Sequence, residues 1–198
     1  MPELQNEIPT KEELYRYFME RCARLMQPDV QTDNDNLAEA FRLGCKQLLR
    51  RTGECIFESL QRLNQLPRTD PFWRNTNKRP TIFKLDQFGR RELDIKPDDR
   101  QALWMLAALD VFHGSNSFGR AYWMRLQKLG DFDITWALLA GLWAEVNFGI
   151  GSSEMAKLLI EMESVGEARP LLELFAESRS EQITVWAEAV LELIEPSQ

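Results

Sequence analysis

Apolar side chains recur every three or four positions along most of this chain, a spacing that places them on one face of an α-helix. The first such segment follows Thr10, which forms the pattern of a helix-capping box with Glu13. A longer segment runs from Asn36 to about Leu66 and contains Gly44 and Gly53, where a neighbouring helix can approach closely or the helix can bend. The sequence therefore predicts an N-terminal helical pair over residues 10–66.

After Pro97 the same pattern returns in shorter pieces that are separated by glycine, serine or aspartate. Residues 99–112 are apolar on nearly all sides, so we expect this helix to lie centrally in the molecule. Trp104 and Trp136 each begin an apolar run that ends in a glycine-serine turn, and their offset of 32 residues is typical of a two-helix repeat. The predicted C-terminal helical array, residues 97–195, comprises helices over 96–112, 118–130, 133–149, 152–166, 167–179 and 180–194.

The pattern changes between these two helical parts. Residues 67–80 contain three prolines and predict an irregular segment, whereas Ile82, Lys84 and Asp86 alternate with apolar neighbours before Gly89. The alternation predicts a small β-hairpin insertion around 81–96. We thus expect a mainly α, single helical domain over 1–198, built as an antiparallel helical bundle or a short α-solenoid of helix pairs, with an irregular and hairpin insertion over 67–96.

Charge is distributed unevenly along the 198 residues, which carry a net charge of −7. Residues 62–100 contain ten Lys or Arg and six Asp or Glu, whereas residues 101–198 contain six and fourteen. A basic middle beside an acidic C-terminal half favours association with a charged partner.

Composition also narrows the classes of protein. No apolar run reaches the length of a membrane span, and the acidic start lacks the features of a secretion signal, so we expect a cytoplasmic protein. The three cysteines form no metal-binding pattern with the one histidine, and we expect reduced thiols, no metal and no cofactor.

The basic middle segment interleaves cations with aromatic side chains. Such a segment can neutralise phosphates and stack on unpaired bases, or it can dock on an acidic protein or on the chain's own acidic C-terminal half. We rank protein contact first because the sequence pI is about 4.9, far below that of most nucleic-acid binders. The candidate contact residues are Arg68, Trp73, Arg74, Lys78, Arg79, Lys84, Phe88, Arg90 and Arg91.

The stretch "FHGSNS", which begins at Phe112, resembles the start of the His-Gly-Ser/Thr motif of the diphtheria-toxin-like ADP-ribosyltransferases. The resemblance implies a β-rich fold in which His113 contacts a nicotinamide nucleotide, with a Tyr and a Glu on later strands. The residues themselves predict a turn between helices, in which Gly114 ends one helix and Ser115 or Ser117 caps the next. We favour the turn.

These patterns lead to one leading hypothesis and two alternatives. The leading hypothesis is a non-catalytic protein-protein interaction module, such as an adaptor, an assembly subunit or an inhibitor, that uses charged helix faces and a basic aromatic protrusion. The first alternative is a subunit that contacts single-stranded RNA or DNA through residues 68–91. The second is an NAD-using enzyme centred on His113. The sequence leaves homo-oligomer formation open.

Overall fold

The computed structural model describes residues 10, 12, 13, 16, 20 and 37–195, and all regular elements in this part of the chain are helices. The prediction of a mainly helical protein is therefore confirmed. The helices are α2 (Leu37–Gln65), α3 (Pro71–Thr76), α4 (Thr81–Ile95), α5 (Arg100–Phe112), α6 (Arg120–Lys128), α7 (Ile134–Phe148), α8 (Gly151–Glu161), α9 (Val165–Ala176) and α10 (Glu181–Ile194).

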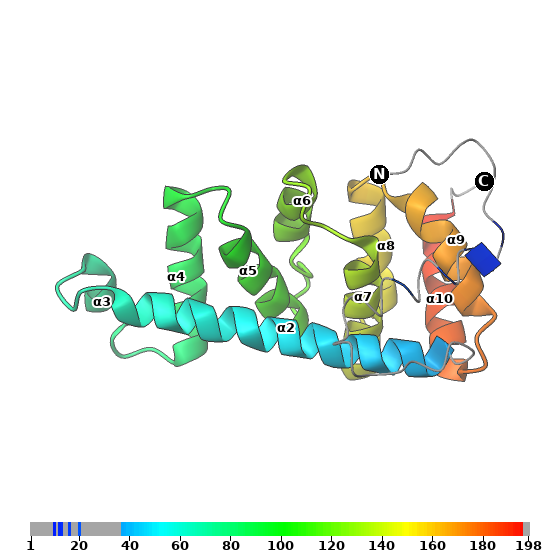
Figure 1. Ribbon diagram of the computed structural model, residues 1–198, viewed down its shortest axis with the longest axis horizontal. Helices are drawn as coiled ribbons and strands as arrows, with labels where there is room; N and C mark the ends of the chain where they lie inside the picture. The colour runs from blue at the N-terminus through cyan, green and yellow to red at the C-terminus, as the bar shows by residue number, and fades with distance from the viewer. Residues whose placement is uncertain (1–9, 11, 14–15, 17–19, 21–36, 196–198) are drawn as a thin grey trace.

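Helix α2 organises the molecule along its length. It has 29 residues and at a rise of 1.5 Å per residue is about 44 Å long. Figure 1 shows α2 lying across a row of upright helices, with α3 and α4 at one end and α9 and α10 at the other. It packs against α4, α5 and α7 in turn.

The C-terminal helices pack as sequential neighbours: α5 with α6, α7 with α8, and α9 with α10. Trp104 and Trp136, the two tryptophans of the repeat expected from the sequence, are in contact. Their rings meet edge to face, with 5.5 Å between the ring centroids. The ring of Trp123 also meets that of Trp104 edge to face, with 5.2 Å between their centroids. This arrangement is compatible with the expected stack of helix pairs.

The predicted β-hairpin around 81–96 is wrong, because residues 81–95 form helix α4. Leu85, Phe88 and Gly89 share the buried face of this helix, at three- and four-residue spacing. Gly89 is not a turn residue but lies where α4 and α5 approach closely, since a Cβ atom there would lie 2.5 Å from Met105 Cε on α5.

Residues 67–80 are also more regular than expected. Pro71 stands at the start of α3, and the Asp70 carboxylate accepts a hydrogen bond from the Phe72 N–H at 2.9 Å. Proline at a first helical position and aspartate before it are a standard helix start. The segment does not form an extended protrusion, because Trp73 packs against the core.

The core has two parts that share α2 and α5. The larger cluster includes Phe41 of α2 and Leu103 of α5 together with residues of α6 to α10. The smaller one joins Leu63 of α2 and Leu106 of α5 to Trp73 and α4. Residues 67–96 therefore pack against α2 and α5, the helices that precede and follow them in the chain.

At the N-terminus the predicted capping box is confirmed. The Thr10 N–H donates to the Glu13 carboxylate at 2.8 Å, and the Glu13 N–H donates to the Thr10 hydroxyl at 3.3 Å. These bonds hold the pKa of Glu13 below its ordinary value. Most of the helix expected to follow lies outside the described residues.

Candidate functional site

Two of the nine candidate contact residues belong to the core. Trp73 is 4% exposed and Phe88 is 2% exposed, and both lie in the smaller cluster. Their rings stabilise α3 and α4 against α2 and α5, so they offer no free aromatic surface to a partner.

Two further candidates, Arg90 and Arg91, are held by carboxylates of their own segment. Arg91 binds Asp70 through two hydrogen bonds of 2.7 and 2.9 Å, which lower the pKa of Asp70. Arg90 donates to Asp86 one helical turn earlier, and this bond raises the pKa of the Arg90 guanidinium. Arg91 therefore joins α4 to the start of α3, whereas Arg90 is paired within α4.

The remaining five candidates form the surface that we call the basic end. The guanidinium of Arg68 stacks over the Trp73 ring at 4.2 Å, and that of Arg79 stacks over Phe83 at the same distance. Stacking orients a guanidinium while its N–H edge stays available. None of the five forms an ion pair with a described residue. The basic end consists of Arg68, Arg74, Lys78, Arg79 and Lys84.

The aromatic rings beside the basic end, Trp73 and Phe83, are each covered by an arginine. Arg68 covers one face of Trp73, whose other atoms are buried, and Arg79 covers one face of the half-buried Phe83. Single-stranded nucleic acid binds by stacking successive bases on exposed rings. The exposed apolar side chain beside these cations is aliphatic: Ile82, which is 50% exposed.

A second charged surface lies on α10, where we predicted no site residue. Glu181, Val185, Glu188 and Glu192 follow one another at helical spacing on one exposed face, and Val185 is 58% exposed. The three carboxylates form no ion pair with a described residue. The spacing of these four residues is visible in the sequence and could have revealed the surface. We call it the acidic face of α10.

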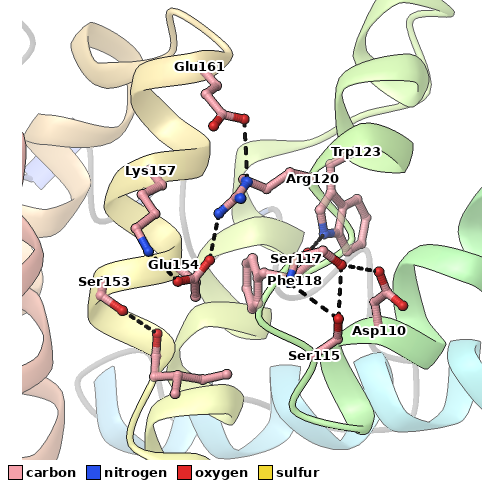
Figure 2. A network of polar contacts seen from close by, with 11 residues as sticks. Asp110, Ser115, Ser117, Phe118, Arg120, Trp123, Ser153, Glu154, Lys157 and Glu161 are labelled. Atoms are coloured by element: carbon pink, nitrogen blue, oxygen red, sulfur yellow. Dashed lines mark hydrogen bonds and ion pairs between the residues drawn. The ribbon is translucent and has the colours of Figure 1, made fainter.

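The loop around His113 is a connection between α5 and α6, as expected. His113 is the exposed C-cap of α5, and Gly114 has a φ of +64°, the left-handed conformation that ends a helix. The predicted serine cap is wrong, because Gly119 is the N-cap of α6. Ser117 instead donates to Asp110 at 2.5 Å (Figure 2).

The elements before and after the His113 loop are helices, whereas the resemblance to the ADP-ribosyltransferases implies strands. The described residues after Gly114 contain helices α6 to α10 and no strand. The tyrosine and glutamate that the motif requires thus have no strand positions in this part of the chain.

An ion-pair network around the buried Glu154 carboxylate joins the start of α6 to α8, as Figure 2 shows. Arg120 and Lys157 each bind the Glu154 carboxylate at 2.6 Å, and Arg120 also reaches Glu161 at 3.4 Å. The Glu154 side chain is only 7% exposed. The network leaves no free carboxylate of Glu154 for chemistry and serves to fix α6 against α8.

A shallow hollow of about 200 Å³ lies between α2 and the start of α5. Arg51 lines it, with its guanidinium 4.9 Å from the Trp104 ring centre, and Gln101 donates to Glu58 at 2.6 Å. Burial raises the pKa of the Cys55 thiol in its wall, so this thiol is a poor nucleophile. The lining residues are Arg51, Glu54, Cys55, Glu58, Arg100, Gln101, Trp104 and Asp131.

Two other observations concern the described residues as a set. Among them no group of three or more His, Cys, Asp or Glu side chains is arranged to hold a metal ion. None of their helices combines the length and the apolar character needed to cross a membrane.

Comparison of the chain with known protein families, with curated proteins and with solved structures finds no match. Inferences about function therefore depend on the geometry described above.

Proposed function

We propose that the protein is a non-catalytic interaction module whose basic end binds an acidic segment of a protein partner. One observation carries this proposal: five cations without an acidic partner among the described residues gather at one end of a chain whose net charge is −7. Elsewhere on the molecule, cations such as Arg62, Arg120 and Arg125 pair with carboxylates.

The side chains of the basic end suit protein contact in two respects. Arg68 and Arg79 are held on aromatic rings, so less side-chain entropy is lost when they bind carboxylates. Ile82 supplies an exposed apolar group among the cations, in keeping with interfaces that have an apolar centre and a polar rim. Charge complementarity of this kind accelerates association and makes it sensitive to salt.

Nucleic-acid binding by the same cations is the alternative. The cations would suit phosphates, but base stacking needs exposed rings, and Trp73 and Phe88 are buried. We therefore place the acidic polypeptide first and make the oligonucleotide an arm of the test.

The test compares the binding of fluorescent poly-L-glutamate to the native chain, to a Lys78→Glu/Arg79→Glu variant and to a Lys96→Glu/Lys128→Glu variant. The second variant is the matched control, because it changes the net charge equally at exposed lysines that are not among the five residues of the basic end. We expect the first variant to lose affinity about tenfold or more and the control to lose less than about twofold. Equal losses would contradict the proposal.

A single-stranded oligonucleotide of similar charge provides the second arm. Binding of the oligonucleotide through Lys78 and Arg79, with no binding of poly-L-glutamate, would replace the proposed function by the nucleic-acid alternative. Both titrations are repeated at several salt concentrations, because a contact made by these cations weakens as salt screens it.

A further inference from the structure

The acidic face of α10 and the basic end lie at opposite ends of the molecule. Figure 1 shows α3 and α4 at one end of α2, whereas α10 lies at the other. With α2 about 44 Å long, the basic end does not reach the acidic face within one copy. The same two surfaces can meet between copies.

The two surfaces are complementary in more than charge. On the acidic face, Val185 is 58% exposed between carboxylates that precede and follow it on the same face. At the basic end, Ile82 is 50% exposed and follows Lys78 and Arg79 in the chain. Each surface therefore offers one exposed aliphatic side chain among groups of a single sign. Contact would remove both aliphatic side chains from water and pair the surrounding charges.

We propose that copies of this protein associate head to tail, with the basic end of one copy on the acidic face of α10 of the next. The proposal rests on the proposed function, since it names the partner of the same basic end. The two contact surfaces differ, so the interface is heterologous and every added copy leaves one free surface of each kind. Association by this route gives open chains whose length grows with concentration.

The interface is small, and its charges are exposed. Two aliphatic side chains and a few screened ion pairs fall short of the area that a permanent complex buries. Association is therefore weak, and it is favoured at high protein concentration and low ionic strength.

Sedimentation equilibrium of the full chain tests this proposal. At about 20 mM salt we expect the weight-average mass to rise with protein concentration, and at about 500 mM salt, where the Debye length is only a few ångströms, to return to the monomer mass. A mass that stays at the monomer value at low salt and high concentration overturns the proposal.

A charge-swap experiment identifies the surfaces. Arg74→Glu/Lys78→Glu/Arg79→Glu leaves two cations and three carboxylates at the basic end, and Glu188→Lys/Glu192→Lys leaves two cations and one carboxylate on the acidic face. Each variant should remain monomeric at low salt, because its two surfaces then carry net charge of the same sign. An equimolar mixture of the two should associate again, since each reversed surface then meets a complementary one. The Lys96→Glu/Lys128→Glu control should associate like the native chain.

The outcomes separate this proposal from the proposed function. A native chain that stays monomeric yet binds poly-L-glutamate through Lys78 and Arg79 overturns head-to-tail association and leaves the interaction module intact. Loss of both observations overturns both. Association that persists in each reversed variant alone also overturns the proposal, because it places the contact on other surfaces.

Discussion

The carboxylate of Glu154 connects two segments that are 34 residues apart in the chain. Its side chain is 7% exposed, and Arg120 and Lys157 both donate to it at 2.6 Å. A carboxylate in such surroundings needs its cations, because an unpaired buried charge is costly. The two cations differ in exposure: the Arg120 side chain is 25% exposed and that of Lys157 is 56% exposed. Their contributions should differ accordingly.

Replacing Arg120 with Met should lower the free energy of unfolding by about 2–3 kcal/mol, because Glu154 then loses its less exposed partner. Replacing Lys157 with Met should cost less than about 1 kcal/mol, as expected for an exposed ion pair. Urea denaturation of the two variants measures both values. Equal costs would show that the burial of the pair does not set its contribution.

Asp99 should make stability depend on acid pH. Burial alone would raise the pKa of Asp99, but hydrogen bonds from Arg62 and the Ala102 N–H outweigh it, and the pKa of this carboxyl lies below its ordinary value. A group with a lowered folded pKa stabilises the fold above its unfolded pKa of about 4, and this stabilisation is lost as pH falls through the folded value.

The change that checks this is Asp99→Asn, which keeps a helix-capping side chain and removes the charge. Between pH 6 and pH 3 the urea midpoint of the native chain should fall more steeply than that of the variant. Parallel decreases would show that other carboxyls account for the acid sensitivity.

At the level of helices, glycine determines how closely neighbouring elements approach. A Cβ atom on Gly151 of α8 would lie 1.9 Å from the Gly141 carbonyl oxygen of α7, so the two backbones are in contact. Gly44 of α2 allows a similar approach, with the Leu139 side chain 3.0 Å from the same notional atom. Gly53 of α2 has nothing within 4 Å. Glycine thus permits close helix packing at Gly151 and Gly44, whereas at Gly53 it meets no neighbour and only lowers the helix propensity of α2.

Exchange of each glycine for alanine should therefore have opposite signs. Gly151→Ala should destabilise the protein by roughly 3 kcal/mol, since backbone must move to admit the methyl group. Gly53→Ala should stabilise it by about 0.5–1 kcal/mol, because alanine is the better helix former and meets no neighbour. Thermal unfolding of both variants followed by circular dichroism measures the two shifts. A stable Gly151→Ala protein would contradict the close contact of α7 and α8.

For the whole molecule, α2 and α5 link the two parts of the core. Phe41 and Leu63 place the two ends of α2 in different clusters, whereas Leu103 and Leu106 place two different faces of α5 in them. Neither cluster keeps its packing if these helices unfold. The charges follow the same long axis, with the basic end and the acidic face of α10 at its two extremes.

The shared helices predict a single cooperative unfolding transition. Helix content and tryptophan fluorescence should change at the same urea concentration, because Trp73 reports on the smaller cluster and Trp104 and Trp123 on the larger. A Trp73→Phe variant removes the reporter of the smaller cluster and should leave the fluorescence midpoint in agreement with the helix signal. Two separated transitions would show that the clusters fold independently.

The helices of the C-terminal array and α2 could be predicted from the sequence, and so could the turn at Gly114. Each of these depends on local spacing, because a helix with one buried face repeats its apolar residues every three or four positions. The basic character of the middle segment was equally visible. These features need no knowledge of what lies opposite the helix.

Only the tertiary structure decided the form and the use of residues 67–96. Alternating apolar residues in a short segment fit a strand or a helix, and the contact of Gly89 with Met105 on α5 is what distinguishes a close helix pair from a turn. In the same way, Arg90 and Arg91 pair with Asp86 and Asp70, and Trp73 and Phe88 are buried in the core. Five of the nine candidate residues are left with neither a place in the core nor an ion pair to a described residue. Local spacing reports one face of an element, whereas burial and charge pairing depend on residues brought together from distant parts of the chain.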